Sequence, residues 1–214
     1  MWNVLPKFGV IKGLMVFFSA ILIFILTFFL TPGKASGTFS YLISTLKFST
    51  SLVFIFLLFV YAMGKWGWQY VWDSERFGRT LNAAICPNLN GHWVAEITSN
   101  FAENARRIGD VVITADMFSI TMELRSDDNY QQSKVTYSQL YKDPRTNAFY
   151  LTYLFEGFVP NPAPTDDKEF NGAAKLLISV EADEIEMAGT YWTDRAWQRK
   201  LNTAGTIKLK RNRS

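Results

Sequence analysis

The residues with the clearest chemistry lie near the end of the chain, where Arg195, Trp197 and Arg199 occupy alternate positions. In an extended chain, side chains two positions apart point to the same side, so these three share a face if the strand stays extended beyond Thr193. Guanidinium groups make paired hydrogen bonds to phosphates, and an indole ring offers a stacking surface to a base. The pattern predicts a site for an anionic aromatic ligand. The alternative is that residues 194–203 form the loop of the last hairpin, with both arginines in water.

The chain before this segment has the pattern of a β domain. From Asn90 onward apolar and polar residues alternate, which is typical of strands with one buried and one exposed face. Clusters of Asp, Asn, Gly and Pro separate the alternating runs and predict turns. Eight strands are expected, near residues 91–98, 110–115, 117–125, 131–141, 148–158, 173–182, 185–193 and 204–211.

Eight antiparallel strands in succession favour a closed barrel, because closure removes the free edges that an open sheet would leave. The expected fold is therefore an all-β domain with a compact, up-and-down, lipocalin-like barrel, and a β-sandwich is the alternative. The long proline-containing segment from Val159 to Asp167 is expected to cover one mouth of this barrel.

The interior of the expected barrel is mainly apolar. If Trp93 points inward, Ala95 and Ile97 follow it, and the inward residues of the other strands are mostly aliphatic or Phe. Such an interior is filled by its own side chains, so a charged ligand must bind at an open mouth. The candidate contacts are polar and aromatic residues of inward parity near strand ends, with the segment that follows them: Tyr137, Tyr153, Tyr191, Thr193, Arg195, Trp197 and Arg199. The three tyrosines fit a structural place in the barrel core equally well.

Two uncharged apolar runs, 13–33 and 48–64, precede the β domain. Each approaches the roughly 20 residues that a helix needs to cross a bilayer. We expect two transmembrane helices, near 12–32 and 46–66, in an anchor of residues 1–80, followed by a cytosolic ligand-sensing barrel of residues 81–214. A cleaved signal peptide is the alternative for the first run, although that run is long and lacks a small-x-small cleavage site.

The orientation of the two spans follows from the basic residues that flank them. Five lysines and arginines lie outside the connecting loop and two lie within it, namely Lys7, Lys12, Lys65, Arg76 and Arg79 against Lys34 and Lys47. Because basic residues resist translocation, this asymmetry predicts that both termini are cytoplasmic.

The net charge of +3 hides an uneven distribution. Residues 81–186 carry eight basic and sixteen acidic side chains, whereas residues 187–214 carry seven basic and one acidic. Positive potential is therefore concentrated in the last elements of the β domain, where it can attract an anion. Solvated strand faces beside anionic lipid are the alternative explanation.

The composition argues against catalysis. His92 is the only histidine and Cys86 the only cysteine, so neither a zinc cluster nor an intrachain disulfide is expected. The sequence contains no glycine-rich phosphate loop and no nucleophile elbow. The acidic pairs at 127–128 and 166–167 are expected only to keep loops soluble, because adjacent residues point to opposite faces. We expect a binding protein that is not an enzyme and that has no cofactor.

The first expected strand opens with Leu89-Asn90-Gly91-His92-Trp93, which resembles the Gly-x-Trp opening of lipocalins, where the tryptophan plugs the closed end of the barrel. The closing strands contain Gly-Thr-Tyr-Trp at 189–192 and Gly-Thr-Ile-Lys-Leu-Lys at 205–210. Two spans followed by these segments resemble the two-transmembrane β-barrel effectors of bacterial cyclic-oligonucleotide antiphage signalling (CBASS), the fifteenth family of CD-NTase-associated proteins. The resemblance covers about 200 residues, essentially the full chain.

This resemblance implies an effector that is gated by a nucleotide. A CD-NTase makes a cyclic dinucleotide on infection, the barrel binds it, and the effector oligomerises and disrupts the bacterial inner membrane, which causes abortive infection and phage resistance. The implied partners are the cyclic dinucleotide, further copies of the chain, the lipid bilayer and the CD-NTase through its product, with no DNA or RNA polymer. A membrane-anchored, lipocalin-like sensor of a lipid or small molecule without killing activity, and a purely structural anchor, are the alternatives.

Overall fold

A computed structural model of the protein describes residues 16, 17, 19, 21, 51, 53–74, 76–85, 87–100, 105–181 and 184–212. The chain divides into two compact units. One contains Leu5–Gly67, and the other contains Met1–Val4 and Trp68–Ser214. The second unit holds the β domain.

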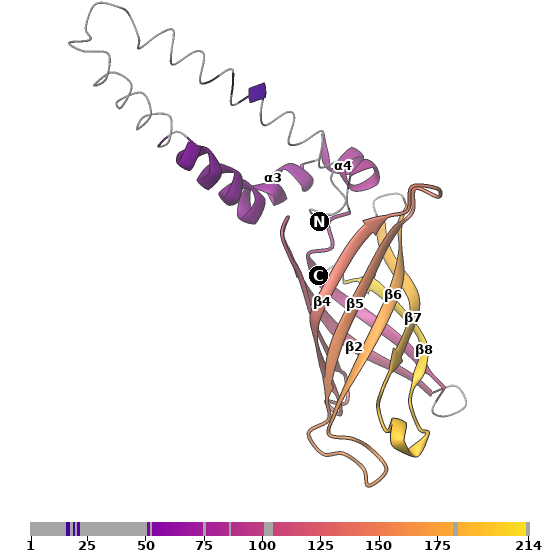
Figure 1. Ribbon diagram of the computed structural model, residues 1–214. Coiled ribbons are helices and arrows are strands. Elements are labelled where there is room, and N and C mark those ends of the chain that lie inside the picture. Colours follow the sequence, from indigo (N-terminus) through magenta and orange to yellow (C-terminus); the bar gives the residue numbers. More distant parts are fainter. Residues whose placement is uncertain are drawn as a thin grey trace, which may run out of the picture. The chain divides into compact units, whose positions relative to one another are not determined.

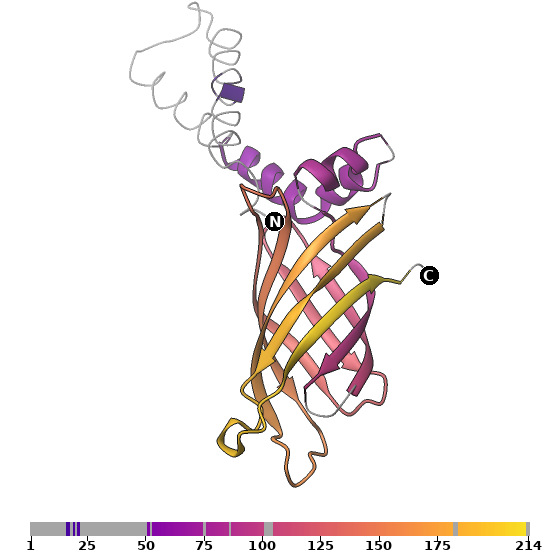
Figure 2. The same ribbon diagram turned by 90° about the vertical axis from the view of Figure 1, so that its right-hand side faces the viewer.

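Eight antiparallel strands form a closed barrel in the second unit (Figures 1 and 2). Each strand pairs with its neighbour in the chain, and β8 pairs with β1 to close the barrel. The strands are β1 Gly91–Ser99, β2 Ala105–Ala115, β3 Ile120–Ser126, β4 Gln132–Lys142, β5 Phe149–Phe158, β6 Glu169–Glu181, β7 Glu184–Thr193 and β8 Ala204–Arg211. The predicted up-and-down barrel is confirmed, and the sandwich alternative is wrong.

Two strands begin earlier than predicted. β2 starts at Ala105 rather than near residue 110, and β6 starts at Glu169 rather than near residue 173. The β2 extension contains the consecutive polar residues Arg106 and Arg107, and the β6 extension has Phe170 as its one large apolar residue, so the apolar alternation that marks a strand is weak in both. These extensions bring charged and polar residues to one end of the barrel.

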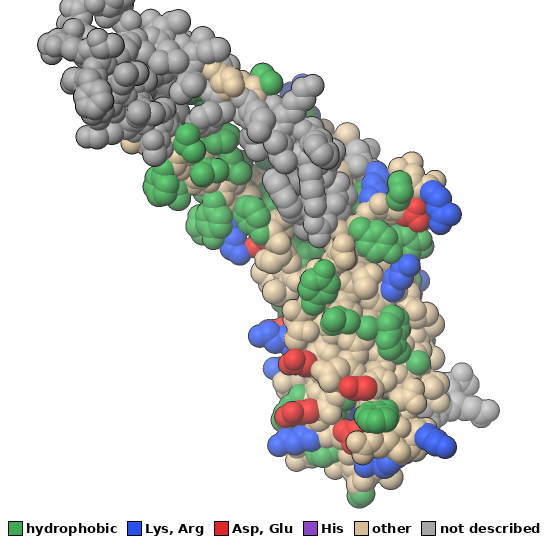
Figure 3. Space-filling view, viewed as in Figure 1, with side chains coloured by type: hydrophobic (Ala, Val, Ile, Leu, Met, Phe, Trp, Pro, Cys, Tyr) green, Lys and Arg blue, Asp and Glu red, His purple; other side chains and the backbone are tan. Residues whose placement is uncertain are grey.

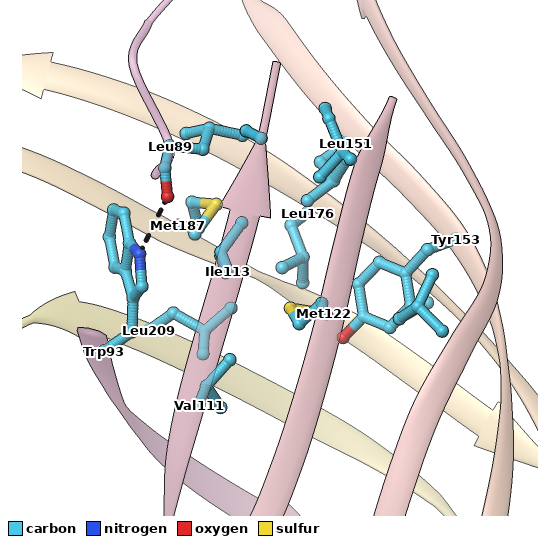
Figure 4. Close-up of a cluster of buried hydrophobic side chains, with 14 of the residues drawn as sticks. Leu89, Trp93, Val111, Ile113, Met122, Leu151, Tyr153, Leu176, Met187 and Leu209 are labelled. Atoms are coloured by element: carbon cyan, nitrogen blue, oxygen red, sulfur yellow. Dashed lines mark hydrogen bonds between the residues drawn. The ribbon is translucent and has the colours of Figure 1, made fainter. Parts of the chain in front are cut away.

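Trp93 closes the other end of the barrel from inside. Its indole N–H donates to the carbonyl oxygen of Leu89 at 3.0 Å, as the dashed line in Figure 4 shows. The guanidinium carbon of Arg211 lies 5.0 Å from the centroid of the indole ring, and Arg211 also donates to the carbonyl oxygens of Asn88 and Asn90. The predicted inward direction of Trp93 and its role as a plug are confirmed.

Apolar side chains fill the interior of the barrel next to Trp93. Val111, Ile113, Leu151, Leu176, Met187 and Leu209 from five strands meet within the barrel and are almost fully buried (Figure 4). Two short helices precede the barrel, α3 Trp68–Trp72 and α4 Gly78–Ala84. Trp68 and Trp72 of α3 belong to the same buried cluster. The core therefore fills the barrel at the Trp93 end.

A β-bulge in β4 reverses the direction of its side chains. The register of β4 against β5 shifts between Val135 and Tyr137, so the alternation that places Val135 inside does not continue to Tyr137. Leu140 is buried again, whereas Tyr137 is 56% exposed. The prediction that Tyr137 faces the barrel interior is therefore wrong, because strict alternation takes no account of an extra residue.

The first unit is described mainly at its end. Residues 53–62 are helical and continue into a π-helix, η1, at Met63–Gly67. Of the helices formed by the described residues, none combines the length and apolar character needed to cross a bilayer. The predicted span 12–32 lies outside the described residues except at 16, 17, 19 and 21, and the predicted span 46–66 is described only at 51 and 53–66.

Candidate ligand-binding site at the barrel mouth

A cavity of about 290 Å³ lies at the end of the barrel remote from Trp93. All eight strands contribute to its lining, for example Ile97 of β1 and Ile207 of β8. The connections β3–β4, β5–β6 and β7–β8 complete the lining, and the last two project from the same end of the barrel in Figures 1 and 2. Ala163, Thr165 and Asp166 of the β5–β6 loop line the cavity, so the predicted cap over one mouth is confirmed.

The segment after β7 differs from the sequence expectation. β7 ends at Thr193, and a short 3₁₀-helix, η2 Trp197–Arg199, follows instead of an extended chain. Ala196 and Lys200, which flank η2, have left-handed backbones with φ of 50° and 59°. This turn separates the three residues that were predicted to share a face, because a strand's alternation does not extend through a helical turn.

Of these three residues, Arg195 alone belongs to the cavity lining. Its side chain is 17% exposed, whereas Trp197 is 63% exposed and Arg199 points to Asp167, with 2.6 Å between Nη2 and Oδ1. Residues 194–203 therefore form the loop of the last hairpin, as the alternative stated. The alternative also placed Arg195 in water, and this part is wrong because Arg195 lines the cavity.

Three segments hold the guanidinium group of Arg195. Nε donates to Oδ1 of Asp166 at 2.5 Å, Nη2 pairs with Oδ2 of the same carboxylate, and Nη1 donates to Oε1 of Gln131 at 3.0 Å. The guanidinium carbon lies 5.0 Å from the ring centroid of Phe170 and 5.9 Å from that of Tyr130. Arg195 therefore joins the β3–β4, β5–β6 and β7–β8 connections across the mouth.

The protonation states of this cluster are coupled. Burial raises the pKa of Asp166, but hydrogen bonds from Arg195 and Tyr130 and the charge of Arg195 outweigh it, so the net pKa lies below its usual value. Burial lowers the pKa of Arg195, and the hydrogen bond and charge of Asp166 more than compensate. The hydrogen bond to Asp166, 2.6 Å from the Tyr130 hydroxyl, raises the pKa of Tyr130. At neutral pH the site holds a charged Arg–Asp pair beside a neutral phenol.

Hydrogen bonds accepted by Asp166 and Asp167 link the β5–β6 loop to the β7–β8 connection. Besides the bond from Asp166 to Arg195, Asp167 accepts hydrogen bonds from Nη2 of Arg199 and from the backbone N–H of Ala196, both at 2.6 Å. The interpretation of this pair as loop solubilisers is therefore wrong. No local pattern reveals these contacts, since their partners lie about thirty positions further along the chain.

The remaining predicted site residues divide into two groups. Tyr153, Tyr191 and Thr193 line the cavity, whereas Tyr137 lies on the outer wall. Tyr153 is buried, and burial raises the pKa of its hydroxyl. The Thr193 hydroxyl lies 2.7 Å from that of Thr203, a contact that joins the end of β7 to the residue before β8. Four of the seven predicted residues therefore line one cavity.

Sequence reasoning missed Arg107 and Tyr130, which both line the cavity. The guanidinium carbon of Arg107 lies 5.3 Å from the ring centroid of Tyr130, and its Nη1 lies 2.9 Å from Oδ2 of Asp128. Arg107 lies four positions before the buried Val111, so alternation traced back along β2 would have placed it on the inner face.

Two phenylalanines line the cavity beside the arginines. The rings of Phe155 and Phe170 meet edge to face, with centroids 6.5 Å apart and planes at 88°. The ring of Phe170 occupies the space beside Gly157, where a Cβ atom would overlap it, and the ring of Phe155 does the same beside Gly172. These rings offer apolar and stacking surface next to a guanidinium group, a combination that suits an aromatic anion.

Comparison with known proteins identifies the class to which this barrel belongs. A family model described as "Cap15, cyclic dinucleotide receptor domain" matches residues 84–211, which include all eight strands. The chain belongs to the Cap15 family of cyclic dinucleotide receptor domains. It is 33% identical to CD-NTase-associated protein 15 of Escherichia albertii over 216 residues, which cover 98% of this chain and 97% of that protein. These matches confirm membership of the family that the sequence resembles.

Proposed function

We propose that this protein is a CBASS effector that binds a cyclic dinucleotide in the cavity at the barrel mouth, without catalysing a reaction. In this proposal two helices anchor the chain in the bacterial inner membrane with both termini and the barrel in the cytoplasm. Ligand binding leads to oligomerisation, membrane disruption and abortive infection. A partner CD-NTase supplies the ligand.

The observation that carries the binding role is the placement of Arg195 over Phe170, with Tyr130 and Arg107 beside them in the cavity lining. Guanidinium groups recognise phosphate oxygens, and aromatic rings recognise bases, so the cavity combines the two recognition elements that a nucleotide needs. A sensor of an apolar lipid would gain nothing from two arginines at this place, because burying their charges is costly.

The helix of residues 53–62 supports the membrane anchor. Apolar side chains are exposed at nearly every position along it, so no single face is reserved for a protein core. A helix that is apolar on all sides is typical of a membrane environment. The exposed apolar residues of this helix are Val53, Phe54, Ile55, Leu57, Leu58, Phe59 and Tyr61.

The outer wall of the barrel supports self-association. Tyr137, Leu154, Ala173 and Trp192 lie opposite one another in register on β4, β5, β6 and β7. Tyr137, Leu154 and Trp192 are about half exposed, and apolar side chains lie over the wall of the barrel in Figure 3. Three exposed apolar residues in one row, with the small buried Ala173 between Leu154 and Trp192, are a feature of interaction surfaces. We assign this row to contacts between copies of the chain.

The binding role is tested by calorimetry on the full-length protein in detergent micelles, with a panel of 3′,5′-linked cyclic dinucleotides. We expect one member to bind with submicromolar affinity, and Arg195→Gln to weaken binding by about tenfold or more because a charge-assisted contact is lost. Arg199→Gln is the matched control, since its side chain lies outside the cavity, and we expect wild-type affinity. Failure of every member to bind to the folded protein would contradict the proposal.

The membrane role is tested with the purified protein in lipid vesicles that contain a fluorescent dye. The ligand that binds is expected to release the dye from vesicles with wild-type protein and to leave protein-free vesicles intact. Trp192→Asp is expected to bind the ligand normally and to release little dye, because a charge interrupts the outer row. Release without ligand, or none with bound ligand, would argue against the effector role.

A further inference from the structure

Two arginine–aspartate pairs lie next to Tyr130 at the barrel mouth. The guanidinium carbon of Arg107 is 5.3 Å from the ring centroid of Tyr130, and that of Arg195 is 5.9 Å from it. Each guanidinium group is paired with a carboxylate, Arg107 with Asp128 and Arg195 with Asp166. Charged side chains of both signs gather at this end of the barrel in Figure 3.

The arginines lie in a strand or close to the end of one, and the carboxylates lie within connections. Arg107 belongs to β2, and Arg195 is the second residue after the end of β7. Asp128 lies in the β3–β4 turn, and Asp166 lies in the long β5–β6 loop. Arg107 therefore lies within a strand and Arg195 lies two residues beyond one, whereas both carboxylates lie further from the strands, within connections.

We propose, resting on the proposed function above, that Arg107 and Arg195 are the two phosphate-binding residues of the site, and that Asp128 and Asp166 occupy their guanidinium groups until the ligand replaces them. A cyclic dinucleotide carries two phosphate groups, and each has one negative charge and two terminal oxygens, as a carboxylate does. Binding is then an exchange of two internal anions for the two anions of the ligand.

Paired binding of a phosphate to Nε and Nη2 of Arg195 would require this exchange. Asp166 engages both Nε and Nη2 of Arg195, and Gln131 engages Nη1. A phosphate that binds in the same paired manner must displace the carboxylate, since the fork that it needs is already occupied. Displacement of Asp166 moves part of the β5–β6 loop away from the cavity, which is small for a dinucleotide at about 290 Å³. The same step therefore exposes the binding group and enlarges the site.

The two pairs differ in burial, and this difference predicts unequal effects. The side chains of Arg195 and Asp166 are 17% and 10% exposed, whereas those of Arg107 and Asp128 are 53% and 50% exposed. A half-exposed pair is weakened by water and salt, so its carboxylate competes less with a ligand. Removal of the Asp166 charge should therefore increase affinity more than removal of the Asp128 charge.

The test is a double-mutant cycle in the full-length protein, with calorimetry against the cyclic dinucleotide that binds to the wild type. We expect Asp166→Asn to raise affinity by about tenfold and Asp128→Asn by about two- to fivefold, as a competing anion is removed. We expect Arg107→Gln to lower affinity by about tenfold, and Asp128→Asn to have no further effect in that background. Thermal unfolding of each variant confirms that it is folded.

Neighbouring residues provide matched controls. Arg106 precedes Arg107 but lies outside the cavity lining and pairs with Glu96 at 2.7 Å, so Arg106→Gln should bind like the wild type. Asp167 also fastens the two loops but contacts Arg199 rather than Arg195, so Asp167→Asn should leave affinity nearly unchanged. A gain in affinity for Asp166→Asn but not for Asp167→Asn separates anion exchange from simple loosening of the loops.

The possible failures are distinct from failure of the proposed function. If no cyclic dinucleotide binds to the wild type, the receptor role itself is contradicted. If a ligand binds and Asp166→Asn weakens it, Asp166 positions Arg195 instead of competing with the ligand, and the exchange is overturned. If a ligand binds equally to Arg107→Gln and to the wild type, the assignment of the second phosphate is overturned.

Discussion

The ring of Phe170 lies against the guanidinium group of Arg195, whose central carbon is 5.0 Å from the ring centroid. This contact orients the cation of the site and gives it an aromatic neighbour. Phe170→Leu keeps an apolar side chain and removes the cation–π contact, which is worth about 0.5–2 kcal/mol. We expect the variant to bind the cyclic dinucleotide several-fold more weakly by calorimetry. Phe158→Leu is the control, because Phe158 is partly exposed and contacts Lys168; an equal loss in both variants would refute a specific role for Phe170.

The Trp93 plug should contribute strongly to stability. Trp93→Ala removes a buried ring, its hydrogen bond to Leu89 and its contact with Arg211. We expect a loss of about 3–5 kcal/mol in the free energy of unfolding, measured by urea denaturation and far-ultraviolet circular dichroism. Trp192→Ala, at an exposed position on the outer wall, should cost far less. If both variants lost the same free energy of unfolding, Trp93 would contribute no more to stability than an exposed tryptophan.

The Asp166 carboxylate should stabilise the fold in a pH-dependent way. Its pKa in the folded protein lies below the ordinary value of 3.8, so the charged form is favoured by folding. Its contribution is complete above that ordinary value and is lost as the pH falls through the lower folded value. We expect Asp166→Asn to lower the free energy of unfolding by about 1.5–3 kcal/mol at pH 7. The difference from wild type should shrink below about pH 4, whereas a pH-independent difference would contradict a charged pair.

The bulge in β4 predicts different roles for two tyrosines of similar sequence context. Tyr191 lines the cavity, whereas Tyr137 is exposed on the outer wall. We expect Tyr191→Ala to weaken ligand binding several-fold and Tyr137→Ala to leave binding unchanged, with stability altered by about 0.5 kcal/mol or less. Calorimetry and urea denaturation of both variants check this. Weaker binding by Tyr137→Ala would show that the outer wall is coupled to the site.

The fold was predictable because the barrel uses one regular pattern. Five of the eight predicted strands agree with the observed ones to within one residue at each end, and the predictions for β2, β3 and β6 overlap their strands over part of the length. Alternation is strong wherever one face is buried, as in Phe149–Phe158, where buried and exposed positions alternate along the strand. The strict order of neighbouring strands then leaves few topologies to choose from.

The site was only partly predictable, because its residues are arranged by irregular segments. Tyr153, Tyr191 and Thr193 follow from alternation, since they lie within regular strands. The prediction for Tyr137 is wrong because a bulge interrupts the alternation of β4. The predictions for Trp197 and Arg199 are wrong because these residues lie in a helical turn and not in an extended strand. The contacts of Asp166 depend on where two loops meet across the mouth, and spacing along the chain does not encode such a meeting.

The closing pair of strands has a consequence for the timing of assembly. β1 and β8 are separated by more than a hundred residues, yet they lie side by side from Trp93↔Arg211 to Ser99↔Gly205. Six of the eight interstrand pairings can form before β8 leaves the ribosome, whereas the β7–β8 pairing and the closing β1–β8 pairing must wait for it. Arg211, which covers the Trp93 ring, lies on that last strand. A chain that ends before β8 therefore forms an open sheet instead of a closed barrel. The ligand-binding cavity is complete only after the whole barrel has been synthesised.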